Sequence, residues 1–512
     1  METVEENKNR IDGSEMLRKF YGRTSTPDKY LKRQQKVLLK LLETAVNTSF
    51  GKQYNFEKII FSEDFISEFQ RSVPLHSYEE IKEWWMRALK GEKDVVTKGK
   101  LQYFALSSGT SDGATKYVPV SKKQLWQFKR QTLKLSLQIA MNKDIPASVF
   151  SKHNLLIGGS IDLNYNGASY IGDLSGIVQL KIPFWYQSFS KPDREVMAMQ
   201  WDSKIENIVL DAANWNVSII TGIPSWVQIV LERIVEHYKL KNIHELWPDL
   251  KVYIHSGIRA EPYINSINKL FGEKVFWYES YLASEGFFAF KLSPEREGMK
   301  LILSDYNFYE FIPFNENNFD SAGNVKRGAE TLTIKDVQPG IDYALVITTC
   351  SGAWRYLIGD TVRFTDVEKA EIIVTGRTKH FLSITGEHLS VDNMNKAVGI
   401  VADEMKFNCK EFTVYAEPKD GGFIHVWNIG CDEHPDVVKL KAMLDENLKI
   451  LNDDYKIERQ FALKDIEVKT FPNELFYQFL SNRGKAGGQV KFPRVLKGEI
   501  LDDWKKFLTT TK

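Results

Sequence analysis

The sequence predicts an α/β fold, and three observations along the chain point to it. Between residues 150 and 305, short apolar runs alternate with amphipathic stretches, which is typical of strands and helices around a largely parallel sheet. Over residues 301–375 the apolar runs follow one another closely, which indicates an antiparallel β subdomain. A smaller mixed set of elements begins after that. We therefore expect a large N-terminal domain over residues 1–377 and a smaller, mobile α+β domain over residues 378–512.

The first part of the chain is predicted to be helical and then to form two short strands. Apolar residues recur at intervals of three and four over residues 30–47, and a Ser-x-x-Glu capping box begins at Ser77. Two β-like runs, 103–106 and 116–120, enclose a loop rich in serine and glycine. A second capping box, Ser-x-x-Gln, begins at Ser121 and predicts a helix that ends near residue 141.

The remaining elements follow from the spacing of apolar residues, which has a period of two in strands and about 3.6 in helices. The expected strands are 155–157, 217–221, 252–255, 275–278, 343–349, 361–365, 370–375, 411–415, 423–427 and 465–470. The expected helices are 225–237, 261–271, 391–404, 435–450 and 473–480.

Length, composition and charge exclude several classes of protein. The 512 residues contain 68 Lys and Arg against 67 Asp and Glu, so there is no overall basic field to attract nucleic acid. The apolar runs are far shorter than the ~20 residues that span a bilayer, and the polar N-terminus has no signal-peptide pattern. We expect a cytoplasmic monomer without nucleic-acid or membrane partners. Three scattered cysteines, and histidines without a His-Glu-x-x-His pair, do not support a structural metal.

The most informative loop reads Ser107-Ser108-Gly109-Thr110-Ser111-Asp112-Gly113. Its hydroxyls and flexible backbone can surround phosphate oxygens, although a loop of this composition is more often a solvated turn. It is not a Walker A loop, which needs Gly-Lys-Ser/Thr. It also contains Gly-x-Ser-x-Gly, but a serine-hydrolase elbow needs a helix directly after the serine, and a β-like run with Pro119 follows here.

Four further segments follow this loop. They are Tyr281-Leu-Ala-Ser-Glu285, Trp354-Arg-Tyr-Leu-Ile-Gly-Asp360, Thr375-Gly-Arg-Thr-Lys379 with Gly386-Glu387, and Gln489-Val-Lys491-Phe-Pro-Arg494. With the loop, this set resembles the adenylate-forming enzymes, the superfamily of firefly luciferase. Within them it resembles a bacterial-type member of the auxin-responsive "GH-three" family of acyl-acid amido synthetases. Single motifs are weak, whereas the ordered set covers residues 100–495 and is specific.

The resemblance implies a ligase that works in two steps. ATP, with Mg2+, activates a small carboxylic acid as an acyl-adenylate, and the nitrogen of an amino acid then displaces AMP. One alternative is an acyl-CoA or acyl-carrier ligase, which shares the first step and differs in its acceptor. A second alternative is a nucleotide-binding protein that has lost turnover. The joint presence of Glu285, Asp360, Arg377 and Lys491 argues against that alternative.

The same resemblance assigns roles to individual residues. The nucleotide-binding residues it implies are Ser107, Ser108, Gly109, Thr110, Ser111, Ser256, Gly257, Tyr281, Ser284, Glu285, Asp360 and Arg377. Among them, Tyr281 stacks on adenine, Glu285 binds Mg2+ and Asp360 accepts hydrogen bonds from the ribose hydroxyls. Lys379 falls in the hinge between the two domains. Lys491 is the catalytic residue, whose positive charge stabilises the transition state.

The candidate residues of the acyl pocket come from a turn that resembles the family and from an expected helix. The turn from Thr221 to Trp226 resembles the strand-to-helix turn at the acid site of the family, which makes Ile223 and Trp226 candidates. Trp126 and Phe128 lie two residues apart on an expected helix, so at most one of them lines the pocket. Plant members of the family read Tyr-Ala-Ser-Ser-Glu where this chain reads Tyr281-Leu282-Ala283-Ser284-Glu285, and several plant loops around the acid site are shortened or replaced here, so no particular acid is implied.

Overall fold

The computed structural model describes most of the chain. The described residues are 26–107, 116–181, 187–257, 260–304, 306–315, 317–320, 323–378, 381–382, 384–385, 387, 389–409, 411–483 and 492–510. Within these ranges, none of the helices combines the length and the hydrophobicity that crossing a bilayer requires.

Eleven of the described strands form one sheet, in the order β12-β13-β14-β15-β11-β10-β9-β8-β7-β3-β6. Its parallel half consists of β6 (Ser190–Lys191), β3 (His153–Ile157), β7 (Val217–Gly222), β8 (Val252–His255) and β9 (Phe276–Ala283). Its antiparallel half consists of β10 (Gly286–Phe290), β11 (Met299–Leu301), β12 (Asn307–Pro313), β13 (Asp342–Thr349), β14 (Tyr356–Asp366) and β15 (Glu371–Arg377). The α/β prediction is confirmed. The two halves, which differ in their sequence pattern, are continuous through the β9–β10 hairpin.

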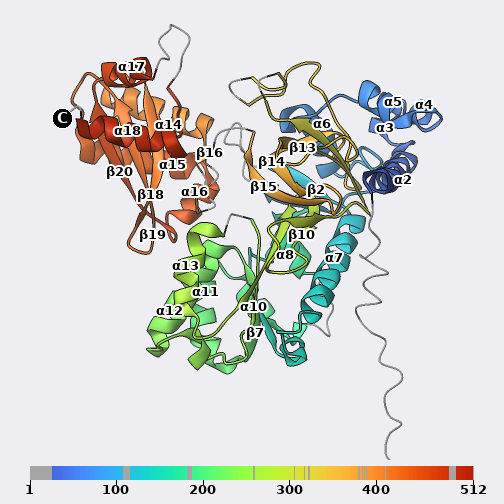
Figure 1. Ribbon diagram of the computed structural model, residues 1–512, viewed down its shortest axis with the longest axis horizontal. Coiled ribbons are helices and arrows are strands. Elements are labelled where there is room, and N and C mark those ends of the chain that lie inside the picture. Colours follow the sequence, from blue (N-terminus) through green and yellow to red (C-terminus); the bar gives the residue numbers. More distant parts are fainter. Residues whose placement is uncertain are drawn as a thin grey trace, which may run out of the picture.

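Helices cover both faces of the parallel half (Figure 1). Val217 and Ile220 of β7 pack on one face in a core with α11 (Trp201–Asp211), α12 (Pro224–Tyr238) and α13 (Glu261–Leu270). Ile219 points to the other face, into a core with α7 (Lys122–Ala140). Ile219 and Ile220 face opposite sides because successive side chains of a strand alternate, and Val217 joins the core of Ile220 because the pairing of β7 with β3 shifts register just after Val217. The run of apolar residues in β7 is therefore explained by burial on both faces.

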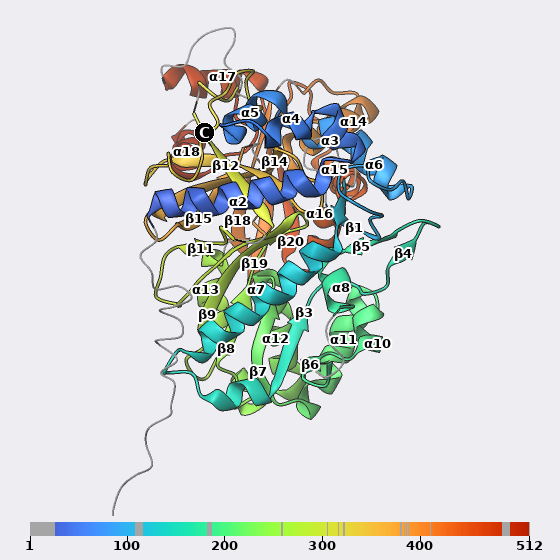
Figure 2. The same cartoon turned by 90° about the vertical axis from the view of Figure 1, so that its right-hand side faces the viewer.

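The N-terminal helices pack against the antiparallel half, as Figure 2 shows for α2 and its neighbours. They are α2 (Pro27–Ala45), α3 (Ser49–Gln53), α4 (Phe56–Ile60), α5 (Phe65–Ser72) and α6 (Tyr78–Leu89). A four-stranded sheet lies beside them, with the order β2-β1-β5-β4. Its strands are β1 (Tyr103–Ser107), β2 (Lys116–Val120), β4 (Asn164–Tyr165) and β5 (Tyr170–Asp173), and α8 (Leu174–Gln179) follows β5.

The C-terminal elements form a separate three-stranded sheet with helices around it, coloured orange and red in Figure 1. The strands are β18 (Phe412–Lys419), β19 (Gly422–Gly430) and β20 (Leu463–Phe471). The helices are α14 (Val391–Met405), α15 (Val437–Leu451), α16 (Asp453–Glu458), α17 (Asn473–Asn482) and α18 (Gly498–Thr510). The predicted mixture of helices and strands is confirmed here, and α16 and α18 are additions to it.

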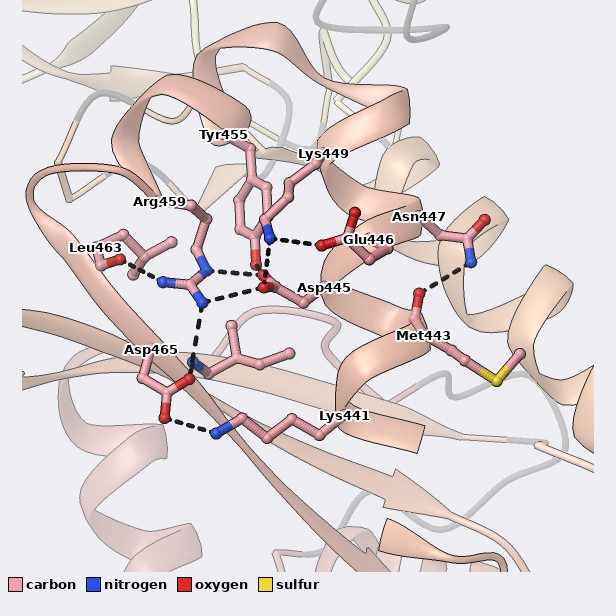
Figure 3. Close-up of polar contacts among 11 residues, drawn as sticks. Lys441, Met443, Asp445, Glu446, Asn447, Lys449, Tyr455, Arg459, Leu463 and Asp465 are labelled. Carbon is pink, nitrogen blue, oxygen red and sulfur yellow. Dashed lines mark hydrogen bonds and ion pairs between the residues drawn. The ribbon is translucent and has the colours of Figure 1, made fainter. Parts of the chain in front are cut away.

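A network of polar contacts fixes α16 between α15 and β20 (Figure 3). The carboxylate of Asp445 accepts hydrogen bonds from the Tyr455 hydroxyl at 2.6 Å and from Nε of Arg459 at 2.7 Å, and Lys449 lies 3.0 Å from it. Arg459 also donates to the carbonyl of Leu463 at the start of β20, at 2.7 Å. The short helix therefore has a defined place in the fold, which matters for Glu458 at its end.

Arg355, from the segment that ends at Asp360, is a buried structural residue. Its guanidinium donates to both oxygens of Glu310 at 3.1 Å and to the carbonyls of Gln70 at 2.6 Å and Val73 at 2.7 Å. The Arg355 and Glu310 side chains are 4% and 1% exposed. Arg355 thus ties the end of α5 to the start of β14.

Replacing Arg355 by methionine is expected to lower the free energy of unfolding by about 3 to 5 kcal/mol, because the Glu310 carboxylate then remains buried without its positively charged partner. The partly exposed pair of Arg363 and Asp342, at 2.8 Å, provides the matched control. Arg363→Met is expected to change stability by about 1 kcal/mol or less. Urea titration of both variants measures the difference, and equal losses would contradict the structural role of Arg355.

Candidate functional site

The ends of the parallel strands bring several predicted residues to one edge of the sheet. Gly222, the last residue of β7, pairs with His255, the last residue of β8. Ile223 and Ser256 follow these two strands and therefore lie at the same edge, and β3 ends beside them at Ile157. The edge at the carboxyl ends of parallel strands is where open α/β sheets bind their ligands.

Gly257 packs directly against Ile223. Its φ of +86° is a left-handed conformation that favours glycine, and a Cβ atom at this position would lie 3.4 Å from Cγ1 of Ile223. The structure therefore brings together a residue predicted for the nucleotide and one predicted for the acid. Both belong to the turns that follow neighbouring strands.

Tyr281, Asp360 and Arg377 form a compact polar cluster. The hydroxyl of Tyr281 donates to Oδ2 of Asp360 at 2.7 Å, and Nε of Arg377 lies 2.8 Å from Oδ1. The two charged residues are opposite one another, because Asp360 of β14 pairs with Arg377 of β15. Burial raises the pKa of Tyr281 well above its usual value, so its hydroxyl keeps the proton that it donates. Three segments that are far apart in the sequence meet here.

Glu285 lies beside this cluster, in the two-residue turn between β9 and β10. Its side chain is buried, and burial raises the pKa of its carboxyl group, while the charge of Lys116 lowers it. The neighbouring Ser284 is held by its carbonyl, which accepts a hydrogen bond from Nε2 of Gln124 at 2.9 Å. A buried carboxylate whose ionised form is disfavoured gains from a nearby divalent cation, so the Glu285 side chain fits Mg2+.

The loop after Ser107 is bounded by two confirmed strands. Ser107, at the end of β1, pairs with Lys116, at the start of β2. Six predicted site residues lie outside the described residues, and they are Ser108, Gly109, Thr110, Ser111, Lys379 and Lys491. Their roles stay predictions from the sequence.

The four candidates for the acyl pocket lie in different surroundings. Phe128 is buried in a core with Phe287, at 5.9 Å between ring centroids, whereas Trp126 is 50% exposed. Their opposite burial agrees with the expectation that they do not share a helix face. Trp226 contacts Trp201, at 4.4 Å between ring centroids, and faces the C-terminal part of the chain. Among the four, and within the described part of the chain, Ile223 is the candidate that lies against a predicted nucleotide residue, Gly257.

The contacts of α12 and α13 with the C-terminal part form an interface that we call the seam. Nε1 of Trp226 donates to Oε1 of Glu458 at 3.2 Å. Further contacts of the seam include the hydrogen bonds from Ser225 to the Thr385 carbonyl, from Gln228 to the Gly421 carbonyl and from Tyr263 to the Ile384 carbonyl. Glu458 was missed by sequence reasoning, because nothing in its local sequence distinguishes it from an exposed glutamate at the end of a helix.

Glu387 shapes the loop on the C-terminal side of the seam. Its carboxylate accepts hydrogen bonds from the backbone N–H groups of Ile384 and Thr385, and Nε2 of the buried His425 lies 3.0 Å away. Although burial raises the pKa of Glu387, the contact with His425 and these hydrogen bonds lower it to about 2. This carboxylate is therefore ionised and holds the loop that contacts Ser225 and Tyr263.

Glu458 is expected to make the seam sensitive to pH. Burial, then the charge of Glu387, raises the pKa of the Glu458 carboxyl well above its usual value, and the Trp226 hydrogen bond opposes this. If the two sides of the seam separated, Glu458 would be exposed to water. Its carboxyl group would then lose its proton near neutral pH. The seam is therefore most stable below the usual glutamate pKa of about 4.3 and weakens as pH rises, by up to about tenfold per pH unit, until the raised pKa is reached.

The measurement is the distance between fluorophores attached to exposed residues of α12 and of α15, followed from pH 6 to pH 8. Wild type is expected to separate further as pH rises, whereas Glu458→Gln, which keeps an uncharged side chain of similar size, is expected to lose this response. An identical response in the two proteins would contradict the role of Glu458.

Comparison with known proteins places these features in context. The chain matches the models of the GH3 family N-terminal domain over residues 17–160 and 139–276, the GH3 family central domain over residues 300–374 and the GH3 family C-terminal domain over residues 392–499. Curated relatives include the 4-substituted benzoates-glutamate ligase GH3.12 of Arabidopsis thaliana, 23% identical over 84% of this chain and 87% of the relative. Another is the jasmonoyl–L-amino acid synthetase JAR4 of Nicotiana attenuata, 22% identical over 96% of this chain and 95% of the relative.

Solved structures show the same fold. The GH3.15 acyl acid amido synthetase aligns with a TM-score of 0.59 and 17% identity, covering 98% of this chain and 96% of its own. A 2-hydroxyisobutyryl-CoA ligase in complex with 2-HIB-AMP and CoA aligns with a TM-score of 0.56 and 15% identity, covering 96% of this chain and 94% of its own. At these identities the likeness concerns the fold alone.

Proposed function

Because the chain belongs to the GH3 family, we propose that it is an ATP- and Mg2+-dependent acyl-acid amido synthetase. It activates a small carboxylic acid as an acyl-adenylate with release of pyrophosphate. It then transfers the acyl group to the nitrogen of an amino acid and releases AMP. The named relatives act on different acids, so the acid and the amino acid of this chain are open to experiment.

The observation that carries this proposal is the cluster of Tyr281, Asp360 and Arg377 beside the strand ends. The Arg377 guanidinium and the Tyr281 hydroxyl hold the carboxylate of Asp360 in one orientation. A carboxylate oriented in this way can accept hydrogen bonds from both hydroxyls of a ribose. Arg377 keeps its positive charge at every physiological pH and suits the phosphate that follows the ribose.

The remaining roles extend this nucleotide site. Glu285 would hold Mg2+, which supplies charge neutralisation on the phosphates when it is bound. Ser107 and the loop after it would hold the outer phosphates, and Ser256, Gly257 and Ser284 would line the nucleotide. Tyr281 would place its ring beside the adenine. Ile223 is the acyl-pocket candidate that the Gly257 contact supports best.

One catalytic role and the hinge concern the smaller part of the chain. Lys491 would place its ammonium group between the attacking carboxylate and the α-phosphate and stabilise the charge that develops there. We keep the division of the chain into residues 1–377 and 378–512, with Lys379 in the hinge, as part of this proposal. Monomeric state and cytoplasmic location also stay predictions from the sequence.

An acyl-CoA ligase is the alternative function, and the fold of the 2-hydroxyisobutyryl-CoA ligase is compatible with it. It would share the adenylation step and differ in the acceptor. The two functions are separated by pyrophosphate release with a panel of aryl, indolyl and aliphatic acids, followed by mass spectrometry of products formed with amino acids or with CoA. An amide formed only with amino acids is the expected result. A thioester in place of the amide would overturn the proposal.

A further inference from the structure

A small cavity lies beside the edge of the sheet, between α8, β6 and α10 (Arg194–Ala198). Its volume is about 290 Å³. Ile161, Pro192 and Met197 give it apolar walls, and Gln179 and Ser190 contribute polar groups. The size suits a ring or a short chain with one small substituent, at the lower end of the range for small-molecule sites.

Two residues that line this cavity, Gln179 and Ser190, each carry a buried polar atom that calls for a partner. The Gln179 side chain is 7% exposed and the Ser190 side chain is 4% exposed. Within the part of the chain that the structure describes, Oε1 of Gln179 and Oγ of Ser190 have no hydrogen-bond partner. Buried polar groups are normally paired with protein, ligand or water, so a ligand group that pairs with both would bind here with a clear advantage.

The charged residues of the cavity are at its exposed rim and already have partners. The carboxylate of Asp193 accepts a hydrogen bond from Lys191 at 2.9 Å, and Arg194 lies within 3.5 Å of the Leu180 carbonyl. The two buried polar side chains of the lining, those of Gln179 and Ser190, are by contrast uncharged. Oε1 of Gln179 accepts a hydrogen bond, whereas the Ser190 hydroxyl can donate or accept. A neutral hydroxyl or amino group satisfies both atoms.

The cavity adjoins the strand ends of the candidate site. A Cβ atom at Gly158, the residue after β3, would lie 2.8 Å from Nε2 of Gln179. β3 is the neighbour of β7, and Ile157 pairs with Gly222, the residue before Ile223. The Gln179 side chain therefore packs against the edge where Ile223 and Ser256 lie.

We propose that this cavity receives the end of the acid substrate remote from its carboxylate, and that the preferred acid carries a hydroxyl or amino group at that end. This inference rests on the proposed function and names its substrate class. The apolar walls accept the ring or chain, and the substituent pairs with Gln179 and Ser190. An acid without the substituent leaves both atoms unpaired.

The test compares matched acids that differ by one group: benzoate with 4-hydroxybenzoate, phenylacetate with 4-hydroxyphenylacetate, and hexanoate with 6-hydroxyhexanoate. The kcat/KM for pyrophosphate release is expected to be about 10- to 100-fold higher for the hydroxylated member of at least one pair. Gln179→Leu, which keeps the side-chain size, is expected to reduce this preference to about twofold or less, and Ser190→Ala is expected to reduce it in part.

Gln127→Leu provides the matched control, because Gln127 is also buried with an unpaired Oε1 but does not line the cavity. It is expected to retain the preference. Titration calorimetry with the same pairs of acids measures their binding affinities without turnover. A preference in binding without pyrophosphate release would contradict the proposed function and leave the cavity assignment standing. Equal binding within every pair, or a preference that survives in Gln179→Leu, overturns the inference.

Discussion

Asp360→Asn is expected to lower the rate of acid-dependent pyrophosphate release by about 100-fold or more. The variant removes the negative charge opposite Arg377. It also replaces one carboxylate oxygen by an NH2 group, which cannot accept a hydrogen bond from the guanidinium or from the Tyr281 hydroxyl. Loss of one partner from a buried charge pair commonly costs about 2 to 5 kcal/mol, and about 1.4 kcal/mol corresponds to a factor of ten. The loss is expected in nucleotide binding as well as in rate.

Asp342→Asn is the control for this substitution. Asp342 of β13 pairs across the sheet with Arg363 of β14, as Asp360 of β14 pairs with Arg377 of β15. The two aspartates thus have the same kind of partner on neighbouring strands, but the pair of Asp342 and Arg363 is partly exposed. Asp342→Asn is expected to change the rate by about twofold or less. Similar rates for the two variants would remove Asp360 from the site.

Lys491→Ala is expected to lower adenylation by about 100- to 1,000-fold while ATP binding remains within about threefold of wild type. The reason is that the lysine acts on charge that develops during the reaction and contributes little to binding of the ground state. Pyrophosphate release and equilibrium binding of ATP measure the two quantities separately. Lys485→Ala, in the glycine-rich stretch of residues 484–488 that precedes Lys491, controls for loss of a nearby positive charge. An unchanged rate in Lys491→Ala would contradict its catalytic role.

The sequence was sufficient to predict the classes of element, and it singled out several residues that the structure brings together. The strand–helix alternation of residues 150–305 predicted the parallel half of the sheet, because buried strands and amphipathic helices leave different apolar spacings. Tyr281, Asp360 and Arg377 were each singled out from separate segments. Their mutual contacts were not predictable, because they depend on the register of β14 and β15, which the local sequence does not specify.

Other features depend on contacts between distant segments and left no local signal. The continuity of the two sheet halves follows from the β9–β10 hairpin, whose turn residues, Ser284 and Glu285, were interpreted only as site residues. Trp226 was expected in the acyl pocket from its place in a turn, yet the tertiary fold sets its indole against Glu458. Gln179 and Ser190 are unremarkable in the sequence, since only packing shows that both are buried beside one cavity.

The most direct test of the central claim is exchange of labelled pyrophosphate into ATP, measured with Mg2+ and a panel of acids in the absence of any acceptor. Exchange occurs when the acyl-adenylate forms on the protein and adenylation is reversible. It therefore reports on the adenylation step alone. We predict exchange that depends on the acid and is lost in Asp360→Asn. ATP and acid that both bind without any exchange would contradict the account of this chain as an adenylate-forming ligase.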